Sequence, residues 1–175
     1  MPNYRRANIN GGTWFFTVVT YRRQTFLCDE PVRITLRRAI DDVRKTHPFS
    51  INGWVLLPDH LHCMWTLPPG DSDFSARWAK IKRLMTKQCK TTLHRDDLMN
   101  TSKTKRNEST IWQRRFWEHH IRNDRDYEHH LDYIHYNPVK HGHVQSPTEW
   151  PWSTFHRYVQ QGLYSARWDD EIDNE

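Results

Sequence analysis

The feature of the sequence that most constrains the fold is a pair of apolar runs, Ile51–Leu57 and Leu61–Leu67, separated by only three residues. A connection this short, with Pro58-Asp59 at the turn, joins two strands only as an antiparallel hairpin. The run Thr13–Thr20 consists entirely of β-branched and aromatic residues, which predicts another strand. A further strand is expected at Phe116–Ile121. An antiparallel sheet is therefore the expected centre of the fold.

Segments with helical periodicity alternate with these strands. In residues 31–47 apolar side chains recur every three or four positions, and a second such segment covers Ser75–Leu93. A third helix is expected over 123–137, because Pro138 disfavours helical geometry in the residue before it. A short helix is expected near 154–161. The order β-α-β-β-α-loop-β-α predicts an α+β sandwich, a central antiparallel sheet with helices packed on one face.

The 175 residues contain no linker and no internal repeat, so one domain is expected. We expect it to span residues 1–165, with a polar, aperiodic loop at about 95–110, and an acidic tail to follow at 166–175. The last seven residues carry five acids and no base, so the net charge of +5 becomes +10 for the rest of the chain. A body this basic indicates a polyanionic partner.

The sequence shows no sign of export or of membrane insertion. No apolar run approaches the ~18 residues that a membrane span needs, and no secretory signal precedes the first strand. Cys28, Cys63 and Cys89 are odd in number and lack CxxC spacing, so reduced thiols are expected. We therefore expect a cytoplasmic protein that associates with the nucleoid and has no membrane partner.

Two histidines stand at the start of the second hairpin strand. Side chains two apart on a strand point to the same side, so His60 and His62 face one way while Leu61 and Cys63 face the core. Two adjacent imidazoles can clamp a metal ion, although a third ligand must then come from elsewhere. The alternative is a pair of surface histidines that alternate with core residues.

The third helix carries a tyrosine that does not fit its apolar stripe. Tyr127, Leu131 and Ile134 lie within about 60° of one another around the helix and form that stripe. Tyr133 lies well over 90° from the centre of the stripe, on an outer face that it shares with Asn137. The alternative is a half-exposed tyrosine on an ordinary amphipathic helix.

Such a tyrosine has a specific chemistry when a metal-bound phosphate lies next to it. Its phenolate can attack phosphorus and form a covalent phosphotyrosine, while the metal ion withdraws charge from the phosphate. Because the phosphodiester energy is kept, a 3′-hydroxyl can later reverse the step.

These residues carry a family resemblance that covers nearly the whole chain. The sequence resembles the REP-associated tyrosine transposases, a branch of the single-tyrosine HUH endonucleases and transposases. The matching segments are Tyr4-Arg5-Arg6, Gly11–Thr17, Trp54–His62, Trp112–Glu118, Asp132–Gly142 and Trp150–Phe155.

The resemblance assigns roles to individual residues. His60-Leu61-His62 matches the His-hydrophobic-His motif, Tyr133 the nucleophile, and Asn137 the third metal ligand, which is usually Gln in the insertion-sequence relatives. The implied metal is Mg²⁺ or Mn²⁺, and the two imidazoles favour Mn²⁺. The implied fold is a ferredoxin- or RRM-like sandwich, the HUH endonuclease fold.

The resemblance also implies an activity and a substrate. The enzyme would be a DNA transposase and single-strand endonuclease that cuts and rejoins DNA at hairpin-forming REP sequences through a 5′-phosphotyrosine. A monomer is expected, with a homodimer as the alternative. Basic side chains are then candidates for DNA contacts. They are Arg5, Arg6, Arg77, Lys80, Lys82, Arg83, Lys87, Arg114, Arg115 and Lys140.

Three rival functions make different predictions. A hydrolytic metal-dependent nuclease would use His60, His62 and Asn137 with an activated water, so that Tyr133→Phe would leave cleavage largely intact. A non-catalytic, RRM-like module would bind hairpin DNA with no need of metal. A structural zinc protein is the weakest alternative, because the cysteines and histidines match no zinc spacing.

Overall fold

The computed structural model describes residues 11–165, so the predictions for Arg5, Arg6 and the tail at 166–175 lie outside the described residues. Four strands form one antiparallel sheet in the order β2-β3-β1-β4. Their bounds are β1 Gly12–Val19, β2 Ser50–Leu56, β3 His60–Leu67 and β4 Trp117–His120. The helices are α1 Glu30–Thr46, α2 Phe74–Leu93, α3 Thr101–Lys105, α4 Asp124–Lys140 and α5 Phe155–Gln160.

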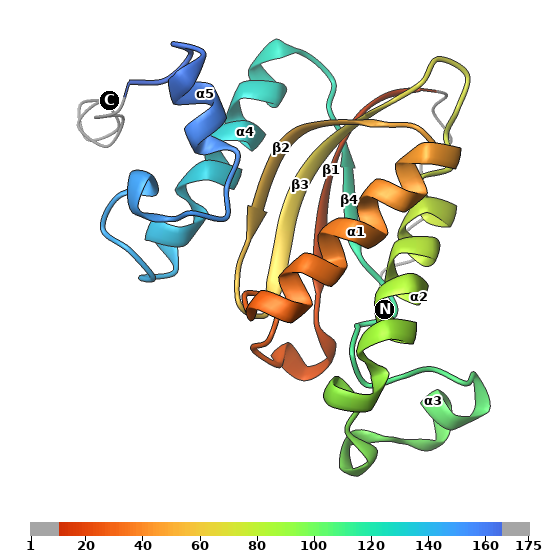
Figure 1. Ribbon diagram of the computed structural model, residues 1–175. Helices are drawn as coiled ribbons and strands as arrows, with labels where there is room; N and C mark the ends of the chain where they lie inside the picture. Colours follow the sequence, from red (N-terminus) through yellow and green to blue (C-terminus); the bar gives the residue numbers. More distant parts are fainter. Residues whose placement is uncertain (1–10, 166–175) are drawn as a thin grey trace.

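The sheet confirms the predicted α+β class and the hairpin. β2 and β3 pair as neighbours, and β1 lies between β3 and β4 (Figure 1). With α1 and α2 as the two crossover helices, this strand order is that of a ferredoxin-like sandwich. The register sets Thr17 of β1 between His62 of β3 and Trp117 of β4, so these three residues lie in one row across the sheet.

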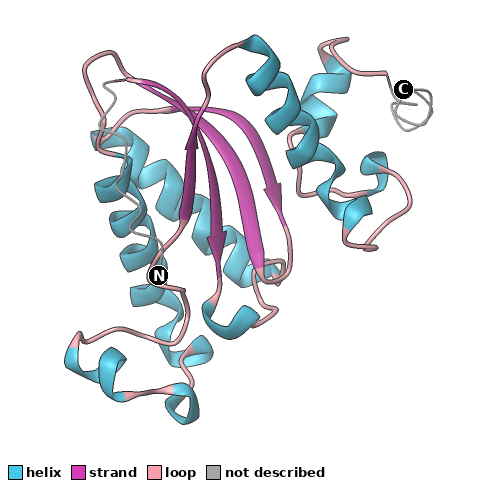
Figure 2. Ribbon diagram, turned by 180° about the vertical axis from the view of Figure 1, so that it is seen from behind, coloured by secondary structure: helices cyan, strands magenta, loops and turns pink. Residues whose placement is uncertain are grey.

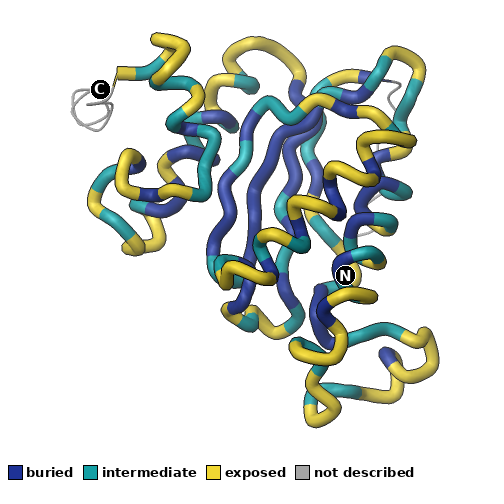
Figure 3. The backbone as a smooth tube through the Cα atoms, in the orientation of Figure 1, coloured by how far each residue is buried: buried dark blue, intermediate teal, exposed yellow. Residues whose placement is uncertain are grey.

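Helices cover both faces of the sheet, so the expectation of helices on one face is wrong. Phe16 and Cys63 pack with Trp78 of α2, whereas Phe15 and Met64 pack with Leu131 and other residues of α4. Figures 1 and 2 show α1 and α2 side by side across one face and α4 beside β2. Phe15 and Met64 place apolar side chains on the face opposite Phe16 and Cys63, and this face therefore needs a cover of its own. Buried residues run along much of the sheet (Figure 3), but on the Phe15 face Trp117 of β4 stays 53% exposed.

Helix α4 extends one turn beyond the predicted end at Asn137. Pro138 lies inside the helix, which continues to Lys140. Proline has no N–H to donate, but the next turn is held by the N–H of His141, which donates to the carbonyl of Asn137 at 3.0 Å. The chain then turns at Gly142, whose φ of +71° is left-handed. The local preference of the residue before proline is therefore overridden here.

The polar segment at about 95–110 is not the aperiodic loop that its composition predicts. It contains α3, which Asn100 caps by accepting a hydrogen bond from the N–H of Lys103. Lys103 is buried, and its Nζ lies 4.1 Å from the ring centre of Tyr21 and donates to the carbonyl of Ser109. A cation–π contact and a backbone carbonyl thus hold a segment that has no apolar pattern.

Two further expectations can be compared with the described residues. Cys28, Cys63 and Cys89 are free, as their number and spacing predict. No helix within residues 11–165 is long and apolar enough to cross a membrane.

Candidate active site

β3 places the two histidines of the His-hydrophobic-His motif side by side. The rings of His60 and His62 lie 4.9 Å apart between centres, nearly perpendicular, and each residue is only 4% exposed. Leu61 and Cys63 point to the other face and pack in the α1–α2 core. The strand alternation therefore acts as the sequence predicts, and it turns both imidazoles toward α4.

Neighbouring side chains hold one nitrogen of each ring. His60 Nδ1 donates to Asp59 Oδ1 at 2.6 Å, and His62 Nδ1 shares a hydrogen bond with Thr17 Oγ1 at 2.8 Å. Burial alone would raise the pKa of Asp59, but hydrogen bonds from His60 and Arg23 hold that pKa below its usual value. Asp59 is thus a carboxylate that orients His60, an arrangement common beside metal-bound imidazoles.

The Nε2 atoms are left to bind a ligand. His62 Nε2 is buried without a hydrogen-bond partner among the described residues. The pKa of His62 is lowered to about 3. Burial is the largest cause, and the positive charges that His60 and His141 can carry add to it. The ring is therefore neutral at physiological pH, as a metal-ligating imidazole must be.

One face of α4 lies over this histidine pair. The ring of Tyr133 lies 5.2 Å from that of His62, and the ring of His141 lies 5.1 Å from that of His60. Asn137 is one turn from each, so the helix period places it on the same face, over the pair. Its Oδ1 and Nδ2 are both buried and have no partner among residues 11–165.

The donor set fits a divalent metal ion. His60 and His62 offer two imidazole nitrogens from β3, and Asn137 offers an amide oxygen from the side of α4 that also carries Tyr133. His62 and Asn137 have buried polar atoms that nothing in residues 11–165 satisfies. Buried polar groups usually have a hydrogen-bond partner, so a ligand from outside the chain could satisfy these atoms. His60, His62 and Asn137 are therefore the residues that would hold the ion.

The expectation that Asn137 lies on an outer helix face is wrong, because Asn137 is 0% exposed. Residues 144–164 cover the C-terminal half of α4, where His135 Nε2 shares a hydrogen bond with Thr154 Oγ1. Tyr133 is half-buried between Phe15 and Lys140, whose Nζ lies 4.7 Å from its ring centre. A positive charge therefore stands directly beside the phenol.

The prediction that Arg77 of α2 contacts DNA is wrong. Arg77 is 1% exposed, and its guanidinium donates to both carboxylate oxygens of Asp71, at 2.6 and 3.1 Å, and to backbone carbonyls. Lys80 Nζ lies 2.7 Å from His47 Nε2, and Lys82 Nζ donates to the carbonyl of Gln113. Three basic side chains of this helix are therefore held by other residues of the protein.

Two other basic residues of α2, Arg83 and Lys87, are exposed. Because α2 packs on the Phe16 face of the sheet and Tyr133 on the Phe15 face, these side chains lie across the sheet from the histidine pair. Their role as DNA contacts stays a prediction.

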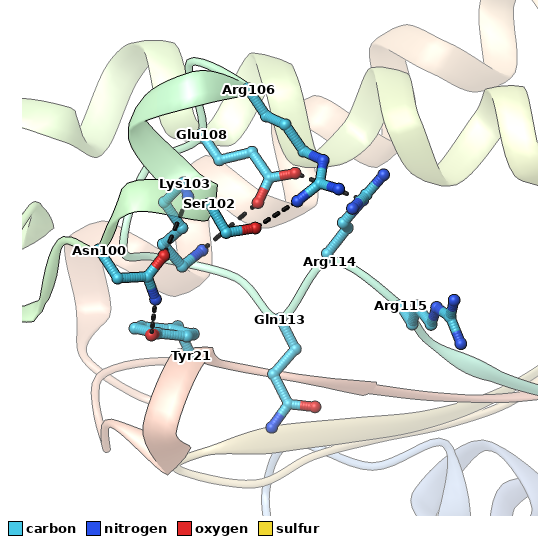
Figure 4. A pocket seen from close by; sticks show the side chains of 9 residues that line it. All are labelled: Tyr21, Asn100, Ser102, Lys103, Arg106, Glu108, Gln113, Arg114 and Arg115. Atoms are coloured by element: carbon cyan, nitrogen blue, oxygen red, sulfur yellow. Dashed lines mark hydrogen bonds and ion pairs between the residues drawn. The ribbon is translucent and has the colours of Figure 1, made fainter. Parts of the chain in front are cut away.

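Arg114 and Arg115 lie at a pocket of about 280 Å³ beside α3 (Figure 4). Glu108 pairs with Arg114 at 3.4 Å and with Lys103 at 3.7 Å, while Arg115 points away from this pair. Asn100 Nδ2 donates to Tyr21 Oη at the opposite wall. Arg115 is thus the more available of the two predicted contacts.

The structure also shows a polar cluster that the sequence analysis missed. His119 of β4 and Asp126 and His130 of α4 bring their ligand atoms within 4.8 Å of one another. Asp126 already accepts hydrogen bonds from His119 Nε2 and from the N–H of Arg122, both at 2.9 Å, and the cluster ties the start of α4 to β4. The spacing of Asp126 and His130, four apart on a helix, was the available signal.

Comparison with known proteins places the chain in a family. Residues 13–137 match the family described as IS200-like transposases. The chain is 49% identical to the REP-associated tyrosine transposase of Escherichia coli (strain K12), over 98% of this chain and 93% of that protein. It is 41% identical to a putative REP-associated tyrosine transposase of Haemophilus influenzae, over 99% and 96%.

A solved structure supports the same assignment. A REP-associated tyrosine transposase bound to a REP hairpin superposes with a TM-score of 0.79 and 50% identity, over 94% of this chain and 89% of that one. The fold, the family pattern and the full-length relatives agree, and the chain belongs to the IS200-like transposases, in the branch of the REP-associated tyrosine transposases, as a DNA transposase.

Proposed function

We propose that this transposase cuts and rejoins single-stranded DNA at REP-type hairpins through a covalent 5′-phosphotyrosine, with Tyr133 as the nucleophile. The observation that carries the proposal is the contact of the Tyr133 ring with His62, 5.2 Å between ring centres, at the end of the sheet where His60 and Asn137 also converge. A nucleophile and a metal-binding set therefore share one site.

His60, His62 and Asn137 hold the metal ion in this proposal, and either Mg²⁺ or Mn²⁺ serves. When bound, the ion supplies Lewis-acid polarisation of the scissile phosphate. Two nitrogen ligands suit Mn²⁺ better than Mg²⁺, which prefers hard oxygen ligands. The hydrogen bonds of Asp59 and Thr17 keep both imidazoles in the orientation that binding requires.

The covalent step begins with loss of the Tyr133 phenol proton. The phenolate oxygen attacks the phosphorus, the bond from phosphorus to the 3′ oxygen breaks, and that oxygen takes up a proton to leave as a 3′-hydroxyl. Lys140 Nζ, 4.7 Å from the Tyr133 ring centre, stabilises the negative charge of the phenolate and of the phosphate. Attack of a 3′-hydroxyl on the phosphotyrosine reverses these steps and rejoins DNA.

The proposed substrate is DNA with a REP-type hairpin, the partner that the superposed relative carries. We propose that one copy of the chain suffices, since His60, His62, Tyr133 and Asn137 all come from one chain. The catalytic domain is residues 1–165, followed by the tail at 166–175. Action on DNA places the protein at the nucleoid.

The test uses a REP-type hairpin oligonucleotide with a single-stranded flank, incubated with Mn²⁺ or with EDTA. Wild type is expected to form a metal-dependent protein–DNA adduct, visible on a denaturing gel and by intact mass. Tyr133→Phe is expected to form none while it binds the hairpin as wild type does. Tyr136→Phe, which alters a neighbouring exposed phenol on the same helix, serves as the matched control and keeps the adduct.

Two outcomes would overturn the proposal. Cleavage that survives in Tyr133→Phe without any adduct would identify a hydrolytic metal-dependent nuclease. Tight, metal-independent binding with no cleavage by wild type would identify a hairpin-binding module.

A further inference from the structure

A groove of about 830 Å³ runs between α1, the edge strand β2 and the segment 151–157. Its walls carry five arginines and a single acid, Asp41. Four of these arginines come from α1 and one from α5, and together they define the arginine groove. They are Arg33, Arg37, Arg38, Arg44 and Arg157.

The arginines of the groove are not neutralised by neighbouring acids. None of the five forms an ion pair with any residue in 11–165. Arg33 lies over the ring of Trp152 at 5.3 Å, and its Nε is buried without a hydrogen-bond partner in the same part of the chain. Arg157 donates to the carbonyl of Asn52 at 2.7 Å. Like charges gathered without compensation repel one another, and an anionic ligand would relieve that repulsion.

Arg37 and Arg38 are the most accessible part of the groove. Both are exposed, and no hydrogen bond or ion pair holds either side chain within the described residues. A guanidinium with free donors matches the geometry of phosphate oxygens.

A continuous line of rings joins the groove to the active site. Successive ring centres lie between 5.1 and 6.3 Å apart, and the last ring carries the guanidinium of Arg33. The line runs from His60 through His141, His143, Trp150 and Trp152. DNA held at Tyr133 can therefore reach the arginine groove along residues 141–152.

The arginine row of α1 is long enough to contact more than one phosphate. From Arg33 to Arg44 the helix rises about 16 Å, at 1.5 Å per residue. Phosphates of one strand rise ~3.4 Å each along the duplex axis but also wind around it, so a straight helix of this length faces only some of the phosphates that it spans. Arginines that contact phosphates position a duplex without reading its sequence.

We propose that the arginine groove binds the sugar–phosphate backbone of the hairpin stem while the single-stranded flank lies at Tyr133. This inference rests on the proposed function for its substrate and adds the surface that holds the duplex part. It also assigns the stem to α1 in place of the basic face of α2, whose Arg77, Lys80 and Lys82 are engaged inside the protein.

The test measures DNA binding in EDTA, so that it requires no cleavage. The variant Arg37→Gln/Arg38→Gln removes two charges from the groove, and Lys90→Gln/Lys105→Gln removes two exposed charges elsewhere as a matched control. Each is titrated with a flanked hairpin and with an unpaired oligonucleotide that carries the same flank, from 50 to 300 mM salt. Thermal unfolding checks that both variants fold as wild type does.

The groove variant is expected to bind the hairpin about tenfold or more weakly at low salt, with the slope of log K against log salt reduced by up to about 1.8 for two phosphates. Its affinity for the unpaired oligonucleotide stays within about twofold of wild type. Equal losses in the control pair would show a general charge effect and overturn the proposal. Equal losses for hairpin and unpaired DNA would place the single strand in the groove and overturn the assignment to the stem. Failure of wild type to form the Tyr133 adduct would leave these binding results standing.

Discussion

At the scale of single residues, Asn137 combines a cost for folding with a proposed role as a metal ligand. Both polar atoms of its side chain are buried without a partner in the described part of the chain. A buried amide in this condition costs about 1–3 kcal/mol of stability for each unsatisfied group. A metal ion at His60 and His62 would accept the amide oxygen as a ligand and recover part of that cost.

We therefore expect Asn137→Ala to separate stability from metal binding. Without metal, the free energy of unfolding should stay within about 1 kcal/mol of wild type, because the loss of unsatisfied groups offsets the small cavity. Added Mn²⁺ should raise the unfolding midpoint of wild type, since a ligand that binds only the folded state stabilises it. That rise should be largely lost in the variant. A variant that keeps the full Mn²⁺-dependent rise would show that Asn137 is not a ligand.

Arg77 shows why a charged residue can be misassigned from sequence alone. Its position among lysines and arginines of α2 predicts a DNA-binding face, yet it is almost fully buried and bound by Asp71 and the carbonyls of His47 and Pro48. Those partners precede the helix and approach it only in the folded chain. No helical periodicity contains that information.

We expect Asp71→Asn to destabilise the protein by about 2 kcal/mol, because it leaves the buried guanidinium of Arg77 without the counter-charge of the partly exposed Asp71 carboxylate. The hydrogen bond from Arg77 holds the pKa of Asp71 below its usual value. A carboxyl with a lowered folded-state pKa contributes stability above its unfolded pKa of about 4 and loses it as the pH falls further. Urea denaturation between pH 7 and pH 3 should thus show a shallower loss below pH 4 in the variant. A variant as stable as wild type at pH 7 would contradict this role.

At the scale of elements, the position at which α4 packs on the sheet determines how close Tyr133 and Asn137 lie to the histidines. α4 crosses β2 at Gly53, beside an irregularity in the β2–β3 pairing. A Cβ at this position would lie 2.9 Å from Leu131 Cδ1 and 3.0 Å from Ile134 Cδ1. The missing side chain of Gly53 therefore sets how close the catalytic helix lies to the sheet.

Gly53→Ala is expected to push α4 away from β2. Overpacking of this kind costs about 1–3 kcal/mol, and adduct formation should fall by at least tenfold because small displacements of reacting groups are costly. Ile134→Val removes the Cδ1 atom that the new methyl group would meet. The double variant Gly53→Ala/Ile134→Val should recover part of the stability and of the adduct. If the double variant is less stable than Gly53→Ala by the amount that Ile134→Val loses alone, the contact between residue 53 and Ile134 does not set the position of α4.

Most elements follow from the sequence because their signals are local. The hairpin of β2 and β3, the strands β1 and β4, and the helices α1 and α2 appear within one residue of their expected bounds. The His60–His62 arrangement was predictable for the same reason, since strand alternation needs no tertiary information. The C-terminal end of α4 packs against residues 147–149, and α3 is held by the contacts of Lys103 with Tyr21 and Ser109, so both depend on tertiary contacts that local patterns could not reveal.

At the scale of the whole molecule, the charge of the chain is divided unevenly. Outside the last seven residues the net charge is +10, and those residues carry five acids. The arginine groove brings together residues of α1 and α5 that are far apart in the sequence, which explains why composition indicated a polyanionic partner but not its location.

Removal of residues 169–175 tests what the acidic tail does. If the tail mainly aids solubility, DNA affinity at 0.15 M salt should rise by less than about threefold, because exposed charges act over a Debye length of only about 8 Å. Fluorescence anisotropy with the hairpin at 0.15 and 0.5 M salt provides the measurement, and the difference should vanish at the higher salt concentration. A rise above tenfold at 0.15 M would mean that the tail competes with DNA for the basic surface.

Mapping the covalent adduct to a single side chain tests whether Tyr133 is the nucleophile. Trypsin should release Asp126–Lys140, a single peptide that carries Tyr127, Tyr133 and Tyr136. After the DNA is trimmed with a nuclease, fragmentation of that peptide by tandem mass spectrometry places the remaining nucleotide phosphate on one tyrosine. The added mass is expected on Tyr133. A modification on Tyr127, on Tyr136 or on another peptide would contradict it.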